Sequence, residues 1–324
     1  MFDQGIVPEA GYDGIGMELE ELGTRARASR DRLLDELGLA DGVGLLDRFL
    51  KDAPGPGRLD SYKVFTPAAG ELVALACASA GEPGASAFLR AAILHGLADS
   101  AAGARMAVLP PRVRRQQLAQ FRRILAADDA AAPWLRLDHD LFHKEFGIAT
   151  LRLYVAGARL VDPRCGVPRS LLARGTPLDW LRCATTIATI GGFRPYFQIH
   201  THQFMLEHFN EEGSNECYRC CAELYQLHPE VLGMFGSSWF YDPALATVSP
   251  RLAYLREVPT GAGARLLYVA TGGEANANAL SKSPTRRSLH EAGRYIPKNY
   301  MLIWGRRRQQ AWARSQPAFS PQAG

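Results

Sequence analysis

The spacing of apolar residues divides the chain into a helical first part and a mixed second part. From about residue 17 to residue 128, apolar positions recur at helical intervals in alanine-rich segments separated by Gly/Pro breakers. From about residue 146, short alternating runs between turn residues predict strands. We therefore expect three regions: a helical region over 1–130 that serves as support or lid, a mixed α/β catalytic domain over 131–316, and a flexible tail over 317–324.

Turn and capping residues predict the individual elements of the second part. Gly157 lies between two apolar runs and predicts a hairpin over 151–161. Thr176-Pro177-Leu178-Asp179 predicts a helix start, because Thr caps, Pro fits the first helical position and the acid favours the first turn. The remaining predicted elements, in chain order, are a strand at 195–202, a helix or helix pair at 203–228, a strand at 231–241, a hairpin of 252–258 with 264–270, a helix at 276–292, a strand at 300–304 and a helix at 306–315.

Composition narrows the class of protein. The chain has 324 residues, of which 47% are hydrophobic and 22% charged, and this is typical of a folded globular protein. The net charge of +4 is too small to imply a nucleic-acid partner. We see no apolar run of about 18 residues and expect no membrane span. Met1-Phe2-Asp3-Gln4 lacks the pattern of a signal peptide, so we expect a cytoplasmic protein that acts on a small molecule.

Three of the six cysteines raise the question of a zinc site. Cys217, Cys220 and Cys221 lie close together, but no second Cys or Cys/His pair follows at the spacing of a zinc finger. With Leu224 and His228 they form one helical stripe, which favours burial of the thiols in the core. His139 and His143 have helical i,i+4 spacing, and we expect them on a polar helix face.

The strand predicted at 195–202 carries two histidines on one face. Residues two apart on a strand are separated by about 6.5–7 Å, so His200 and His202 can converge on one ion or one substrate. With Glu207 or His208 they would form a ligand set that suits iron or another divalent metal. A metal-free role in proton transfer and a purely structural role remain open, since imidazole serves all three uses.

Positive charge gathers near the C-terminus. From residue 281 to residue 324 there are nine basic residues and a single acid, Glu291. Thr271, Gly272 and Gly273 follow a predicted strand and precede a helix that carries Arg286 and Arg287. A glycine-containing turn into a helix offers N–H groups to an anion, and arginine adds bidentate phosphate contacts, so this region is a candidate site for coenzyme A. The alternative is a solvated basic face.

Several motifs in the second half resemble other sequences. The motifs are His200-Thr201-His202, Phe209–Gly213, Ser238–Pro243, Ser249–Leu255 and Thr285-Arg286-Arg287. Together they resemble a family of uncharacterised bacterial proteins, and that resemblance implies no activity.

The order of elements from residue 195 is similar to that of the GNAT-type acyltransferases. This resemblance implies a GNAT-like mixed sheet that binds an acyl-CoA pyrophosphate on a loop between a central strand and the following helix. We place that loop at 271–278, although the usual Gln/Arg-x-x-Gly-x-Gly/Ala motif is absent there.

These observations lead to three hypotheses of different classes. The first is an α/β (α+β) enzyme that uses a coenzyme A thioester, with His200 or His202 as general base and Tyr241 or Tyr254 as acid. The second is a metal-dependent oxidoreductase that uses the two histidines as ligands. The third is a non-enzymatic binding protein that uses the N-terminal helices. Those helices are also candidates for an oligomer contact, such as that of a homodimer.

Overall fold

The computed structural model describes residues 12–39, 41–51, 61–127 and 131–316. The chain forms two compact units, the first comprising Met1–Gly55 and Tyr62–Val155 and the second Pro56–Ser61 and Ala156–Gly324. The division between Val155 and Ala156 falls later in the chain than the boundary predicted at residue 130, and the tail predicted at 317–324 lies outside the described residues.

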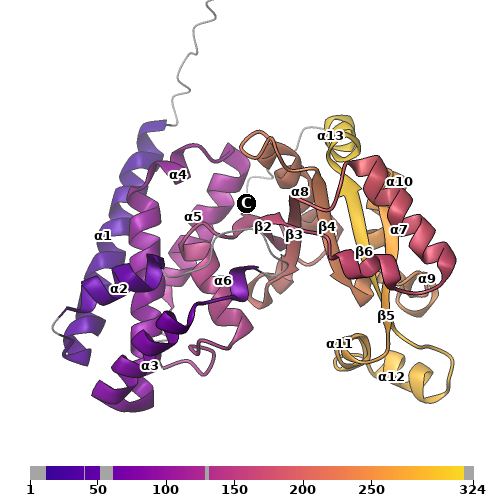
Figure 1. The fold of residues 1–324 in the computed structure, drawn as a ribbon. Helices are drawn as coiled ribbons and strands as arrows, with labels where there is room; N and C mark the ends of the chain where they lie inside the picture. Colours follow the sequence, from indigo (N-terminus) through magenta and orange to yellow (C-terminus); the bar gives the residue numbers. More distant parts are fainter. Residues whose placement is uncertain (1–11, 40, 52–60, 128–130, 317–324) are drawn as a thin grey trace, which may run out of the picture. The chain divides into compact units, whose positions relative to one another are not determined.

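The first unit is helical up to its last residues. Helix α3 packs against α1, α2 and α6 (Figure 1). Phe49 lies at the centre of the core, with ring contacts to Phe88 and Phe146 at 5.8 and 5.5 Å between centroids. The elements are α1 (Tyr12–Leu37), α2 (Gly42–Lys51), η1 (Ser61–Lys63), α3 (Pro67–Ala102), α4 (Ala104–Ala107), α5 (Pro111–Ala126) and α6 (Asp140–Ala149).

Helix α3 bears on the expectation that the chain has no membrane span. Among the described residues it is the one helix long and apolar enough to cross a membrane, although charged residues such as Glu82 and Arg90 interrupt its apolar stretch. The helix is kinked at Gly81, and its apolar residues beyond the kink, such as Phe88 and Leu97, are fully buried. A core helix passes the same test of length and composition, and one such helix is weak evidence for a membrane span.

The second unit is built on a six-stranded mixed sheet, as the sequence predicts. The strand order is β1-β2-β3-β4-β6-β5. Strands β3 and β4 run parallel, whereas the pairs β2–β3, β4–β6 and β5–β6 run antiparallel. The strands are β1 (Tyr154–Ala156), β2 (Arg159–Cys165), β3 (Tyr196–Thr201), β4 (Gly233–Ser238), β5 (Arg265–Thr271) and β6 (Lys298–Gly305).

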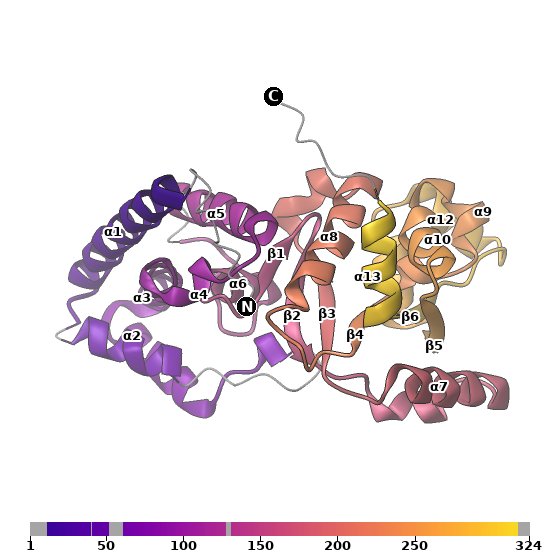
Figure 2. The same ribbon diagram turned by 90° about the horizontal axis from the view of Figure 1, so that it is seen from above.

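Helices cover both faces of this sheet (Figure 2). Helix α7 (Pro177–Ile190) packs Cys183 and Ile187 onto one face, where Tyr196 of β3 is buried. Helices α8 (Glu211–Leu224) and α13 (Arg306–Ser315) contact each other on the other face. The remaining elements are η2 (Arg169–Ala173), η3 (Gln203–His208), η4 (Trp239–Tyr241), α9 (Leu245–Val248), η5 (Pro250–Leu252), α10 (Tyr254–Gly261), α11 (Glu274–Leu280) and α12 (Pro284–Glu291).

Most of the predicted elements of the second unit are confirmed, and two are wrong. The hairpin turns at Gly157, and Thr176 and Asp179 form a capping box at the start of α7. The hairpin predicted for 252–258 with 264–270 is wrong, because the first segment is helix α10 and β5 pairs with β6 instead. The single helix predicted at 276–292 is two helices, since Ser283 caps a new start in front of Pro284.

Candidate functional site

Strands β3 and β4 pair over a short distance and then part. Their ladder consists of two positions, Phe197–Met234 and Gln198–Phe235, although the strands continue to Thr201 and Ser238. In open α/β sheets, ligands bind outside the carboxyl ends of neighbouring parallel strands. Backbone N–H and C=O groups on the facing edges of parted strands also need hydrogen-bond partners. The carboxyl ends of β3 and β4 are therefore the first place to look for a site.

Arg159 brings a buried positive charge to this place. It lies at the start of β2 opposite Thr201, is 3% exposed, and donates from Nη1 to Thr201 Oγ1 at 3.1 Å. Its guanidinium group lies 4.7 Å from the ring centroid of Phe209 and 5.9 Å from that of Phe240. Among the described residues, its buried Nη2 has no hydrogen-bond partner and no carboxylate pairs with it. Because a buried charge is costly without a counter-charge, Arg159 is suited to an anion or to developing negative charge.

The Tyr241 hydroxyl lies over Gly236 on the same face of the sheet as Ile199. A Cβ at Gly236 would lie 2.6 Å from Tyr241 Oη and 2.9 Å from Ile199 Cγ1, so only glycine fits there. Among the described residues, the buried Oη has no hydrogen-bond partner. Burial raises the pKa of Tyr241 although the nearby Arg159 lowers it, so the hydroxyl keeps its proton at neutral pH and can donate it.

Tyr254 lies at the start of α10, close to the same charge. Its hydroxyl donates to the Phe209 carbonyl at 3.4 Å, and the ring is half-buried. Burial raises the pKa of Tyr254, while Ser214 and Arg159 lower it. The structure thus brings both predicted tyrosines near Arg159, but the hydroxyl of Tyr254 already has a partner.

The two histidines of β3 are in different environments. His200 is half-buried and, by strand alternation, lies on the face opposite Ile199 and Thr201. His202 follows the strand and is 0% exposed, with its ring 5.5 Å from that of Phe204. His200 keeps some exposed surface and His202 keeps none, so His200 is the more accessible of the two histidines.

The metal-ligand set predicted around these histidines is not assembled. Glu207 and His208 lie on η3 with side chains that are 77% and 61% exposed, and they pair with each other at 3.4 Å. Within the described part of the chain, no group of three His, Cys, Asp or Glu side chains is placed to hold a metal ion. The arrangement therefore gives the metal-dependent alternative no support. Cys217, Cys220 and Cys221 are fully buried, as predicted.

The loop predicted to bind coenzyme A follows an outer strand of the sheet. Thr271 ends β5, which is last in the strand order, and Gly272 and Gly273 follow it with positive φ angles. The resemblance to GNAT-type acyltransferases implies a central strand instead, and the central strands here are β3 and β4. The loop at 271–278 therefore does not have the position that this resemblance implies.

The arginines predicted to bind phosphate contact the protein itself. Arg286 is 5% exposed, donates from Nε to the Ala279 carbonyl at 2.6 Å and from Nη1 to Ser249 Oγ at 3.1 Å, and lies 4.5 Å from the Trp239 ring. Arg287 donates from Nη1 to two carbonyls at the end of α11. These contacts hold α11 in place, and Arg286 is buried among them, whereas Arg287 is exposed and donates only from Nη1 to described residues.

Sequence reasoning missed Arg159. Its only signal was an arginine at the start of an apolar strand, directly after the Gly157 turn. That position is equally typical of an exposed strand end. Its burial depends on the contacts with Phe209 and Phe240, which are far away in the sequence.

Comparisons with known proteins give little further information. No protein-family model matches the chain, and no curated protein matches it. The resemblance to uncharacterised bacterial proteins therefore stays a prediction. A crystal structure of an acyltransferase in complex with decanoyl-CoA is similar over 85% of this chain and 98% of that chain, with 13% sequence identity and a TM-score of 0.41. A likeness at this level is too low to support an argument about function.

Proposed function

We propose that this protein transfers an acyl group from a coenzyme A thioester to a small-molecule acceptor at the carboxyl ends of β3 and β4. The observation that carries the proposal is the buried Nη2 of Arg159 near the hydroxyl of Tyr241, two groups that have no hydrogen-bond partner in the described part of the chain. Acyl transfer creates negative charge twice, on the oxygen of the tetrahedral intermediate and on the leaving thiolate. A preorganised buried cation stabilises such charge strongly.

Each side chain then has a defined task. The acceptor attacks the thioester carbonyl carbon, the C–S bond breaks, and the acceptor gives up a proton. Arg159 stabilises the oxyanion, and Tyr241, which keeps its proton at neutral pH, donates it to the departing sulfur. His200 takes the proton of the acceptor from the opposite face of the sheet, since a ligand held between two strands is reached from both faces. The amide groups of the pantetheine arm suit the facing edges of β3 and β4 beyond their two-position ladder.

A binding and turnover experiment on the full chain tests the proposal. Acetyl-CoA and a long-chain acyl-CoA are titrated by calorimetry, and release of free CoA thiol is followed with pooled amine and alcohol acceptors. We expect thioester binding, and we expect Arg159→Met and Tyr241→Phe to slow thiol release by roughly 100-fold or more. Arg294→Gln is the matched control, because Arg294 is exposed and lies between α12 and β6. The proposal is refuted if neither thioester binds, or if all variants release thiol at the same rate as the unchanged protein.

A further inference from the structure

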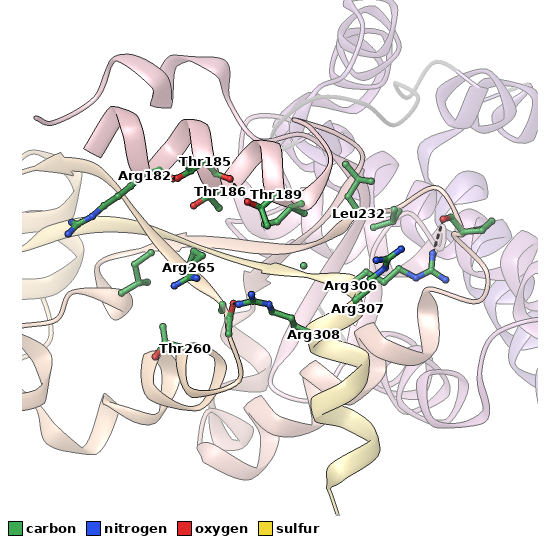
Figure 3. Close-up of a pocket in the computed structure, with 17 residues that line it drawn as sticks. Arg182, Thr185, Thr186, Thr189, Leu232, Thr260, Arg265, Arg306, Arg307 and Arg308 are labelled. Carbon is green, nitrogen blue, oxygen red and sulfur yellow. Dashed lines mark hydrogen bonds between the residues drawn. The ribbon is translucent and has the colours of Figure 1, made fainter. Parts of the chain in front are cut away.

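A large basic pocket lies at the opposite end of the sheet. It has a volume of about 1060 Å³ and is formed by the second half of α7, the start of β5, the start of α13 and the segment leading into β4 (Figure 3). None of the described residues that line it is acidic. Five arginines line it: Arg182, Arg265, Arg306, Arg307 and Arg308.

Three of these arginines have a partner in the protein and two do not. Arg182 forms an ion pair with Asp179 at 3.9 Å. Arg306 donates to the Pro229 carbonyl at 2.7 Å, and Arg308 donates to the Gly263 carbonyl at 3.1 Å. Arg265 and Arg307 are exposed and make no side-chain hydrogen bond or ion pair with a described residue. Figure 3 shows Arg265 and Arg308 extending toward the space below the threonines of α7. Apart from Arg182, the arginines that line the pocket form no ion pair with a carboxylate of the described residues.

The start of α13 makes this concentration of charge more unusual. Arg306, Arg307 and Arg308 occupy its first turn, which contains no acidic residue. Cations at a helix N-terminus are unfavourable, because the unpaired N–H groups there carry partial positive charge. Three neighbouring guanidinium groups also repel one another. An anion in the pocket would relieve both effects and would accept hydrogen bonds from the same groups.

The remaining walls restrict the kind of anion. The hydroxyls of Thr185 and Thr189 donate to carbonyls of α7 itself, so they offer acceptors rather than donors to a ligand. Ile190, Leu232 and Leu266 add apolar surface beside the arginines. The volume exceeds the requirement of a single phosphate and is at the upper end of the range for small-molecule sites.

We infer that this pocket binds a small molecule that carries two or more phosphate groups on a larger, partly apolar body, as a nucleoside diphosphate or triphosphate does. The site is separate from the one proposed for acyl transfer. It lies at Leu232, before the first residue of β4, whereas Tyr241 follows the last, and a six-residue strand spans about 20 Å. The inference does not depend on the proposed acyl transfer.

Calorimetric titration of the full chain with ADP, ATP, tripolyphosphate and inorganic phosphate tests this inference. We expect ADP and ATP to bind, inorganic phosphate to bind much more weakly, and affinity to fall as salt rises. The double variant Arg265→Gln/Arg307→Gln should weaken binding by about 100-fold or more, because two charge-assisted hydrogen bonds to the phosphates are lost. Arg294→Gln removes one positive charge outside the pocket and should leave binding unchanged.

Two results would overturn the inference. One is the absence of binding by every polyphosphate; the other is an equal effect of Arg294→Gln and the double variant. Coenzyme A also carries several phosphate groups, so it is titrated in competition with ADP. Competition would identify coenzyme A as a ligand of this pocket, whereas simultaneous binding would identify the pocket as a second site. Arg159→Met should leave ADP binding intact, and this separates a failure of the pocket from a failure of the proposed acyl transfer.

Discussion

Replacing Arg159 by methionine separates stability from function at the candidate active site. Removing the guanidinium group from its buried position avoids a desolvation cost of several kcal/mol. The hydrogen bond to Thr201 offsets about 1.5–3 kcal/mol of that cost. The contact with the Phe209 ring offsets about 2 kcal/mol more. These contributions nearly cancel, and a methionine packs well against aromatic rings. We therefore expect the free energy of unfolding to change by less than about 2 kcal/mol.

Arg286→Met is the matched comparison, because Arg286 is equally buried but fully engaged with the protein. The variant loses two charge-assisted hydrogen bonds and leaves the Ala279 carbonyl without its buried donor. We expect a loss of about 3–5 kcal/mol. Urea denaturation followed by circular dichroism measures both variants, and a shift of the midpoint at constant slope reports stability alone. The reasoning is refuted if Arg159→Met destabilises the protein as much as Arg286→Met, or if Arg159→Met retains full thiol-release activity.

Three further predictions concern single side chains. Tyr241→Phe removes a hydroxyl that has no partner among the described residues, so stability should change by less than about 1 kcal/mol while thiol release slows; a large loss of stability would contradict this. Gly236→Ala places a Cβ 2.6 Å from Tyr241 Oη, so the free energy of unfolding should fall by about 1–3 kcal/mol. In steady-state kinetics, the same variant should lower kcat more than it raises KM. Burial lowers the pKa of His143 from 6.5 to about 4, so the unfolded chain binds the proton more tightly and stability should fall as pH decreases from 6.5 to 4, by roughly 2–3 kcal/mol in denaturation curves. His143→Phe should remove this pH dependence, whereas His139→Gln should retain it.

Local signals in the sequence were sufficient to predict most helices and strands of the second unit. The Thr176 capping box, the Gly157 turn and the alternation in the strands at 195–202 and 300–304 all lie within a few residues of the structure that they determine. The prediction for 252–258 was wrong because its apolar residues fit both a strand and an amphipathic helix. The structure shows a helix, in which the buried residues Leu255 and Pro259 are four positions apart. His143 was expected on a polar face, but it is buried beside Phe65 and Phe142.

The sequence by itself therefore determined most of the helices and strands of the second unit, since periodicity and capping act over a few residues. It also identified Tyr241 and Tyr254 as candidate acids. The tertiary structure alone decided that β3 is a central strand and β5 an outer one, because strand order depends on contacts between distant segments. It alone buried Arg159 with no counter-charge from the residues that the structure describes, and it alone brought five arginines from three elements around one pocket. The burial of a side chain and the number of charges around it depend on residues that are distant in the sequence, so a local sequence pattern does not predict them.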